Sequence, residues 1–235
     1  MTFCKWEDLP EKMKTPVVKS YYDILGKKRA SLVCKRVFDI VVSAVMLIIL
    51  SPLFLILAIA IKLDSKGPVF FRQVRITQYG REFRIHKFRT MVSGADKIGS
   101  QVTVEADPRI TKVGTVLRGC HLDEIPQLID ILFGDMSFVG TRPEVPKYVE
   151  SYTDEMMATL LLPAGVTSEA SIRYKDEAEL LDKANDVDKI YVEKVLPDKM
   201  KCNLRGIEKY SFWGDIRIMF MTFFAMFGKK YEEME

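Results

Sequence analysis

The chain has 235 residues, and its 35 Lys and Arg against 32 Asp and Glu leave a formal net charge of only +3. This near balance argues against a nucleic-acid binder, which normally carries a strongly basic surface. The apolar residues are segregated, because the 22 residues from 40 to 61 include no charged side chain. A single run of this kind excludes an ordinary soluble globule and also a polytopic transporter, which would need many such runs.

This run is preceded by 36 mostly polar residues that end in a basic cluster. A helix of 22 residues extends about 33 Å, which is enough to cross a hydrocarbon core. Ser51 and Pro52 lie near the middle of the run, and proline there predicts a kink. Basic residues flank both ends, with Arg36 before and Lys62 after, and such residues favour the cytoplasmic side. Two alternatives stay open: a kinked helix that crosses the membrane, and a re-entrant helix that enters and returns.

Two β-like segments, 69–76 and 82–90, follow this run and flank Gln78-Tyr79-Gly80, which predicts a β-hairpin. Between residues 69 and 90 there is one acid, Glu82, and there are six basic residues, Arg72, Arg75, Arg81, Arg84, Lys87 and Arg89. A ribbon this basic beside a membrane segment suits anionic lipid headgroups or a phosphorylated ligand, and charge alone does not decide between them.

Helical patterns dominate the remainder of the chain. We expect helices over 123–132, from about 143 to 162, over 176–183 and over 188–195. The apolar stretch 218–227 has ten residues, too few to span a membrane, and its basic flanks favour a helix along the membrane interface. The cysteines lack any CxxC pair, which argues against a zinc site or a disulfide framework: Cys4, Cys34, Cys120 and Cys202.

Asp123 and Glu124 are adjacent acids at an expected helix start. The positive end of a helix attracts anions, so Asp123 could act as a nucleophile towards phosphorus and Glu124 could hold a divalent cation. Ordinary helix capping is the alternative. Arg118 and Arg142 flank the pair, and arginines grip phosphate oxygens bidentately. A glycosidase is a weaker interpretation, because its two carboxylates must stand about 5 Å or more apart around a sugar.

Six segments occur in the order found in one known family. They are Lys-Arg-Val-Phe-Asp at 35–39, Ser-Pro at 51–52, Gly-Pro-Val-Phe-Phe-Arg-Gln at 67–73, Lys-Phe-Arg-Thr-Met at 87–91, Leu-Asp-Glu-Ile-Pro-Gln-Leu at 122–128 and Gly-Asp-Met-Ser-Phe-Val-Gly-Thr-Arg-Pro at 134–143. Over about residues 32–228 the chain therefore resembles the bacterial sugar transferase family, the monotopic polyprenyl-phosphate phosphoglycosyl transferases.

The resemblance implies an activity and a set of roles. Family members transfer a sugar 1-phosphate from a UDP-sugar to undecaprenyl phosphate and release UMP, using Mg²⁺ and a covalent phosphosugar-enzyme intermediate. Matched motif to motif, Asp123 would be the nucleophile, and Glu124 with Asp123 would hold the metal. Lys87, Arg118 and Arg142 would bind the substrate phosphates. The product would enter bacterial glycan assembly, such as exopolysaccharide, lipopolysaccharide or capsule biosynthesis.

The resemblance also favours the re-entrant alternative, because Ser51-Pro52 matches the kink of the family's N-terminal helix. The expected fold is α+β and mostly helical, membrane-associated, with an N-terminal re-entrant helix hairpin, a small β-hairpin and interfacial amphipathic helices. We expect a polar basic segment over 1–36, a re-entrant membrane helix over 37–63 and a cytosolic or interfacial catalytic domain over 64–235, the short single-domain form. The expected location is the bacterial inner (cytoplasmic) membrane, with the site facing the cytoplasm among membrane lipids. A homodimer is one assembly the sequence allows.

Residues 163–174 depart from the Pro-Gly-Ile-Thr-Gly-Trp segment that many members carry. Ala164 is inserted, the tryptophan is missing, and the segment resembles a subgroup with Ala-Ser-Ile followed by basic and acidic residues. We interpret it as a specificity region, with Arg173 as a candidate contact to the nucleotide or sugar. The alternative function is a membrane-anchored, non-catalytic scaffold that recruits glycan-assembly enzymes.

Overall fold

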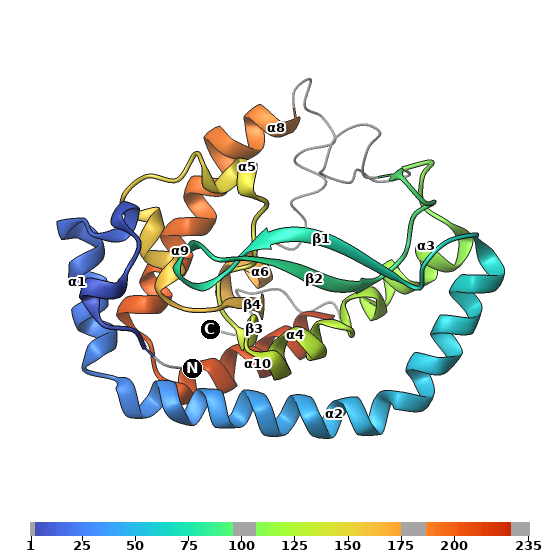
Figure 1. Cartoon of the computed structure of the whole chain (residues 1–235), viewed down its shortest axis with the longest axis horizontal. Helices are drawn as coiled ribbons and strands as arrows, with labels where there is room; N and C mark the ends of the chain where they lie inside the picture. The colour runs from blue at the N-terminus through green and yellow to red at the C-terminus, as the bar shows by residue number, and fades with distance from the viewer. Residues whose placement is uncertain (1–2, 96–106, 175–186, 227–235) are drawn as a thin grey trace.

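The structure is a computed structural model that describes residues 3–95, 107–174 and 187–226. One long helix, α2 (Arg29–Asp64), runs along one side of the molecule, and the other elements pack over it (Figure 1). The strands are β1 (Phe70–Ile76), β2 (Glu82–Phe88), β3 (Met136–Val139) and β4 (Ala164–Thr167). The other helices are α1 (Pro16–Gly26), α3 (Lys112–Gly119), α4 (Gln127–Phe133), α5 (Pro146–Val149), α6 (Glu169–Arg173), α8 (Val187–Ile190), α9 (Leu196–Glu208) and α10 (Phe212–Met226).

The predicted kink takes the form of a bend within a continuous helix. Pro52 lies inside α2, and the Ser51 hydroxyl donates to the Ile48 carbonyl over 2.8 Å, two features that bend helices. In Figure 1, α2 bends and its last part turns towards α3. Only 6% of the most apolar 18-residue window of α2 is buried, so this helix presents most of its hydrophobic surface outwards.

Both ends of α2 are fastened to neighbouring helices of the same body. Near the start, the Arg36 guanidinium donates to the carbonyls of Ile131 and Leu132 in α4, over 2.6 and 2.8 Å. At the end, an Asp64 carboxylate oxygen accepts from the backbone N–H of Val113 in α3 over 3.0 Å. Because α3 and α4 are close in the chain, the two ends of α2 lie against one folded unit.

A buried polar cluster joins the first half of α2 to α10 and β3. The Lys35 ammonium forms an ion pair with Asp215 of α10 and donates to the Val139 carbonyl over 2.8 Å. One turn further, Asp39 accepts from the backbone N–H of Phe138 over 3.3 Å. These contacts give Lys35 and the Oδ1 atom of Asp39 partners that offset part of the cost of burying them, and they fix where the apolar helix lies.

The predicted hairpin is confirmed. β1 pairs antiparallel with β2 from Phe70 opposite Phe88 to Ile76 opposite Glu82, and Tyr79 adopts the left-handed conformation in the turn (φ 59°). A second, parallel pair of strands was not predicted: β3 and β4, each four residues long, are too short to show a periodic pattern. The core between the pairs is apolar and includes Phe83, Ile85, Leu128, Ile131, Met136 and Ala164.

Two of the expected helices were wrong in extent. The helix expected over 123–132 begins at Gln127, because the acids before it form a separate 3-10 turn (Leu122–Glu124). The single helix expected over 143–162 is instead α5 and a 3-10 run (Met156–Leu161), separated by a short polar stretch. There the Thr153 hydroxyl accepts from the backbone N–H of Met156 over 3.3 Å, and such local bonds compete with a continuous helix.

The helix expected over 188–195 is present as α8 followed by a π-helical turn (Tyr191–Val195) that leads into α9, and 176–183 lies outside the described residues. The N-terminal segment, for which the sequence offered no structure, packs with α9 and the Met156–Leu161 run in one apolar core. Its buried members include Met13, Val18 and Leu25. The polar N-terminus is therefore part of the folded body.

Candidate active site

The carboxylate of Glu124 is the centre of the candidate site. Its Oε1 atom accepts from the Lys87 ammonium and from Nη2 of Arg142, each over 2.6 Å. Oε2 accepts from Nη1 of Arg142 over a longer distance, 3.4 Å. The side chains of Lys87 and Glu124 are 19% and 17% exposed, whereas that of Arg142 is 40% exposed. Three residues predicted from separate segments thus form one cluster.

These three side chains arrive from three different elements. Lys87 is near the end of β2, Glu124 ends the 3-10 turn before α4, and Arg142 follows β3 in the loop 140–143. The backbone N–H of Gly140 donates to the Thr167 carbonyl over 2.9 Å, and that loop runs directly against β4. A Cβ at Gly165 would lie 2.1 Å from the Gly140 nitrogen, so only glycine permits this approach.

Arg75 supports the loop that carries Arg142 from behind. Its Nη1 donates to the Pro143 carbonyl over 3.0 Å, and its Nη2 donates to Gln73 Oε1 over 2.8 Å. Burial lowers the pKa of Arg75, and the nearby Glu144 carboxylate opposes that effect. The guanidinium therefore acts as a fixed internal support for the loop.

Asp123 lies beside this cluster and next to a strained backbone position. His121, two residues earlier, adopts the left-handed conformation (φ 54°, ψ 20°), which is uncommon for a residue with a side chain. At this residue the chain leaves the direction of α3 and enters the turn that carries Asp123 and Glu124. The reversal explains why the acids precede α4 and do not form its first turn.

The pKa values of Asp123 and Glu124 are shifted in opposite directions. Burial raises the pKa of Asp123, and the cations of Lys87 and Arg118 oppose that effect. Burial alone would also raise the pKa of Glu124, but Arg142 and Lys87 outweigh it and hold the pKa well below its ordinary value. Burial lowers the pKa of Lys87, while Glu124 stabilises its charged form. Glu124 is thus the fixed anion of the cluster.

His86 and Asp130 form a second buried polar pair, which was not identified from the sequence. Asp130 Oδ2 accepts from the His86 backbone N–H over 2.8 Å, and Oδ1 lies 2.6 Å from His86 Nδ1. Burial raises the pKa of Asp130, and the bonds from His86 oppose it. The pair fastens β2 to α4 immediately beside Lys87. One available signal was the single acid inside the apolar helix segment 127–133.

The remaining predicted residues lie at different distances from this cluster. Arg118 is in the last turn of α3 and acts on Asp123 electrostatically. Arg173 ends α6 and approaches the Cys202 sulfur over 3.9 Å, and it does not line the cavity described next. Ser51 and Pro52 are exposed in α2. The structure therefore brings together Lys87, Glu124 and Arg142, with Asp123 adjacent, and leaves the role of Arg173 a prediction.

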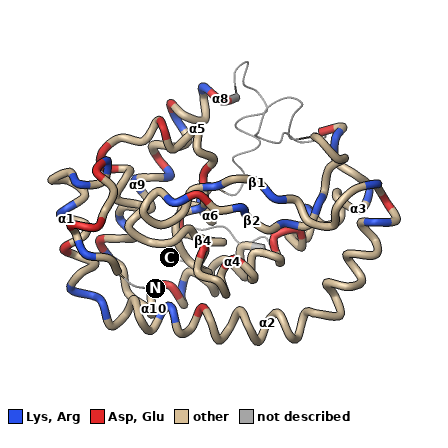
Figure 2. Tube along the Cα trace, in the orientation of Figure 1, with Lys and Arg blue, Asp and Glu red and all other residues tan. Residues whose placement is uncertain are grey.

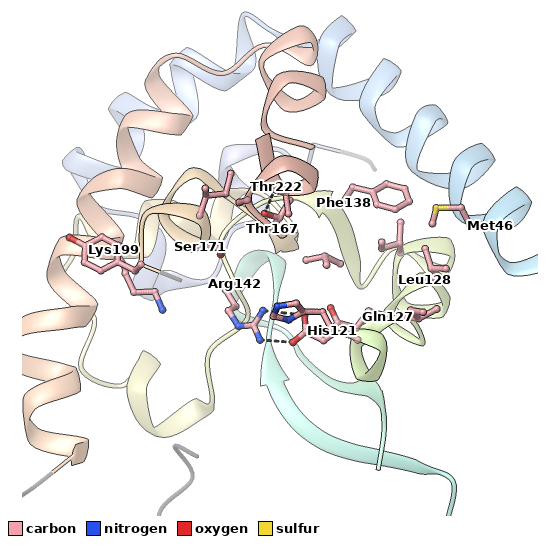
Figure 3. A pocket seen from close by; sticks show the side chains of 17 residues that line it. Met46, His121, Gln127, Leu128, Phe138, Arg142, Thr167, Ser171, Lys199 and Thr222 are labelled. Carbon is pink, nitrogen blue, oxygen red and sulfur yellow. Dashed lines mark hydrogen bonds and ion pairs between the residues drawn. The ribbon is translucent and has the colours of Figure 1, made fainter. Parts of the chain in front are cut away.

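A cavity of about 540 Å³ opens beside Glu124 and Arg142. Figure 3 shows Met46, Leu128 and Phe138 on one side of it, Lys199 on the opposite side and Arg142 between them. Its wall was mostly missed by the sequence analysis, because it draws on α2, α4, β3, β4, α6, α9 and α10 at once. The described lining residues are Met46, His121, Glu124, Ile125, Gln127, Leu128, Ile131, Phe138, Arg142, Val166, Thr167, Ser171, Ile172, Tyr174, Lys199, Thr222 and Ala225.

Asp123 and Glu124 are the carboxylates that could supply oxygen ligands to a metal at this site. Within the described residues, no group of three or more His, Cys, Asp or Glu side chains is arranged around a common point. Mg²⁺ is commonly held by one or two carboxylates together with substrate phosphates. Asp123 and the weakly engaged Oε2 of Glu124 fit that pattern. The four cysteines are free thiols, dispersed over the fold: Cys4, Cys34, Cys120 and Cys202.

Charge is distributed unevenly around the site. Figure 2 shows Lys and Arg repeatedly along β1 and β2, with acids concentrated in other parts of the chain. Arg81 pairs with Asp135, whereas Arg72 donates from its Nε and Nη2 atoms to the Arg84 carbonyl, over 3.2 and 2.9 Å. The near-neutral total therefore conceals a locally basic surface that would attract anionic ligands.

The sequence is similar to known proteins over most of its length. Residues 30–229 match the family described as bacterial sugar transferase. The chain is 37% identical over 227 residues to the UDP-glucose:undecaprenyl-phosphate glucose-1-phosphate transferase of Escherichia coli K12, covering 94% of this chain and 46% of that protein. It is 34% identical over 191 residues to a UDP-N-acetylgalactosamine-undecaprenyl-phosphate N-acetylgalactosaminephosphotransferase of Aeromonas hydrophila, covering 80% and 42%.

A third relative, the putative undecaprenyl-phosphate N-acetylgalactosaminyl 1-phosphate transferase of Bacillus subtilis, is 36% identical over 157 residues, which cover 66% of this chain and 86% of that protein. The chain spans less than half the length of the first two relatives. The family match includes all of α2 except its first residue, both strand pairs and every residue of the cluster around Glu124. The chain therefore belongs to the bacterial sugar transferase family.

Proposed function

We propose that the protein transfers a sugar 1-phosphate from a UDP-sugar to undecaprenyl phosphate and releases UMP, as the first membrane step of a bacterial glycan pathway. The observation that carries this proposal is the contact of Glu124 with both Lys87 and Arg142 beside Asp123. Displacement at phosphorus between two anions needs charge neutralisation and positioning more than proton transfer, and this cluster supplies both.

Asp123 is the proposed nucleophile. Its carboxylate oxygen would form a bond to the sugar-bearing phosphorus, and the bond to the bridging oxygen would break, so that UMP leaves with the electron pair. An oxygen of undecaprenyl phosphate would then attack the same phosphorus and return Asp123 as a free carboxylate. Neither step requires a general base, because both nucleophiles are already anions.

The cations have separate tasks in this scheme. Lys87 is largely buried and held by Glu124, so it would keep a fixed positive charge beside the reacting phosphate. Arg142 is more exposed and faces the cavity, where it would bind the substrate phosphate bidentately. Arg118 would add positive charge near Asp123. Mg²⁺, held by Asp123 and Glu124 Oε2, would neutralise charge on the donor phosphates when bound.

We further propose that α2 is re-entrant and lies in one leaflet of the bacterial inner membrane, with the site on the cytoplasmic side. A helix that crossed the membrane would place its ends on opposite sides, whereas Arg36 and Asp64 contact α4 and α3 of the same body. Exposed apolar side chains on other helices fit an interfacial position. They are Val116 on α3, Phe133 on α4, and Trp213, Phe220, Phe223 and Phe224 on α10.

The test measures UMP released by detergent-solubilised protein with Mg²⁺, undecaprenyl phosphate and a panel of UDP-sugars. We expect one or a few sugars to support release, and we expect Asp123→Asn to abolish it. A rapid quench without acceptor should add the mass of a sugar phosphate to the Asp123 peptide. If no donor supports UMP release, and Asp123→Asn and the wild type behave identically in this assay, the transferase proposal fails and the non-catalytic scaffold is favoured.

A further inference from the structure

We propose that Glu144 and Tyr191 are positioning residues for Arg142, the cation that faces the cavity. The Tyr191 hydroxyl donates to Oε1 of Glu144 over 2.5 Å, and the two residues are 5% and 6% exposed. Neither of them lines the cavity, so each would affect a substrate only through the loop that carries Arg142. The inference rests on the proposed function, and it adds two residues that act on the phosphate-binding loop and not on the substrate itself.

Backbone bonds hold the segment after Arg142 against the end of β1. The Glu144 carbonyl accepts from the backbone N–H of Ile76 over 2.9 Å, and the Pro143 carbonyl accepts from Arg75 Nη1 over 3.0 Å. The segment before Arg142 is bound to β4. The guanidinium of Arg142 therefore extends from a backbone that is fastened on both sides, and a displacement at Glu144 would be passed to it.

The Glu144 side chain is a buried carboxylate, and the Tyr191 hydroxyl stabilises it directly. The Arg75 guanidinium lies near enough for Glu144 to favour its charged form. A buried carboxylate that loses a hydrogen-bond donor is destabilised, so it would shift towards water or towards Arg75. Either movement would displace the backbone of Glu144, which is two residues from Arg142.

Tyr191 belongs to a packed part of the fold and can serve as an anchor. It begins the π-helical turn (Tyr191–Val195), and such turns are frequent at functional positions. Its ring packs on that of Tyr148, with the centroids 4.9 Å apart. The Tyr148 hydroxyl donates to Asp188 over 2.8 Å, which joins α5 to α8. In Figure 1, these two helices lie on the far side of the hairpin from α2.

The placement of Arg142 matters because a guanidinium binds phosphate through two parallel hydrogen bonds, which require both position and angle. A misplacement of about 1 Å at a reacting centre can cost about 100-fold in rate. The loss of one hydroxyl outside the cavity should therefore weaken the binding of a phosphate inside it.

The test measures the Kd for UDP, which carries both phosphates of the proposed donor, by calorimetry on the full-length protein in detergent with Mg²⁺. Tyr191→Phe removes the hydroxyl and keeps the packed ring. Tyr148→Phe is the matched control, because it removes a hydroxyl from the neighbouring ring that is bonded to Asp188 and not to the loop. We expect Tyr191→Phe to raise the Kd about tenfold and Tyr148→Phe to raise it less than about twofold.

Two further variants separate positioning from general damage to the fold. In an Arg142→Met background, Tyr191→Phe should raise the Kd for UDP less than about twofold further, because its effect passes through Arg142. Glu144→Gln keeps a side-chain oxygen that can accept from Tyr191, so it should raise the Kd less than about threefold.

The inference would be overturned by a wild-type Kd in Tyr191→Phe, by equal losses in Tyr191→Phe and Tyr148→Phe, or by an undiminished loss in the Arg142→Met background. UMP release by the same samples separates it from the proposed function. A wild type that binds UDP more tightly than Tyr191→Phe, as expected, but releases no UMP from any donor would reject the transferase and retain the positioning role. UMP release by the wild type together with an unchanged Kd in Tyr191→Phe would reject the positioning role and retain the transferase.

Discussion

Lys87 and Arg142 contact the same oxygen of Glu124 over the same 2.6 Å, yet their removal should have very different effects on stability. Removing one partner of a buried ion pair costs about 3–5 kcal/mol, because the other charge stays buried without compensation. Exposed pairs contribute about 0–1 kcal/mol. The side-chain exposures are 19% for Lys87 and 40% for Arg142. Because Arg142 still pairs with Glu124 after Lys87 is removed, we expect Lys87→Met to cost about 3 kcal/mol, at the lower edge of the first range. Arg142→Met should cost about 1 kcal/mol or less.

The assay is thermal unfolding of the purified variants in one detergent. For a protein of this size, 1 kcal/mol corresponds to about 2–4 °C in Tm, so Lys87→Met should lower the Tm by about 6–12 °C and Arg142→Met by less than about 4 °C. Both should lose UMP release, since both cations are proposed to act on the substrate phosphates. The double variant Lys87→Met/Glu124→Gln removes both charges, and its loss should fall about 2 kcal/mol short of the sum of the single losses.

Equal Tm losses in Lys87→Met and Arg142→Met would refute the ranking by burial. Additive losses in the double variant would show that Lys87 and Glu124 are not coupled. Phe223→Trp, which changes an exposed position on α10, serves as the matched control for handling in detergent and should keep the wild-type Tm.

Three further outcomes follow from other contacts. Asp130→Ala should lower UMP release about tenfold, because it removes the bond that joins β2 to α4. Asp130→Asn keeps one acceptor for the backbone N–H of β2 and should retain most of the UMP release. Equal rates in the two variants would contradict a positioning role for Asp130. The Arg109 guanidinium lowers the pKa of Asp107 to about 2, so this carboxylate stabilises the fold above pH 3.8 and the effect is lost between 3.8 and 2. The Tm difference between wild type and Asp107→Asn should therefore be present at pH 6 and vanish near pH 2, and its persistence there would exclude this origin. In inside-out vesicles, an impermeant maleimide should label Cys34 and a Lys66→Cys variant from the same side, each in a background without other cysteines, whereas a crossing helix would expose them on opposite sides.

The sequence predicted those parts of the fold whose signals are local. The hairpin follows from two alternating segments around Gly80, and α2 follows from one uncharged run with a proline inside it. β3 and β4 could not be predicted separately, because each has only four residues and is a strand only through its pairing with a segment far along the chain. α4 begins later than expected because of the left-handed backbone of His121, which no residue pattern predicts.

The candidate site was predicted as a set of residue types and not as an arrangement. The acid pair and its flanking arginines indicated Glu124 and Arg142, and the resemblance added Lys87. That both cations meet on one carboxylate oxygen is a consequence of how β2, the turn before α4 and the loop after β3 pack. Asp130 was overlooked because its partner is a backbone N–H on another element. Residues that act through tertiary contacts leave little trace in a single sequence.

The cluster around Glu124 has a physical purpose beyond stability. A buried ion pair seldom adds net stability, since the desolvation of its charges offsets their attraction. In the proposed reaction, the carboxylate would hold two cations in place before a phosphate arrives, so they need not be ordered during the reaction. Of the two, Lys87 is enclosed and Arg142 is 40% exposed and faces the cavity. In this proposal Arg142 is therefore the cation that would exchange Glu124 for a phosphate oxygen, while Lys87 would stay on the carboxylate and hold the turn that presents Asp123.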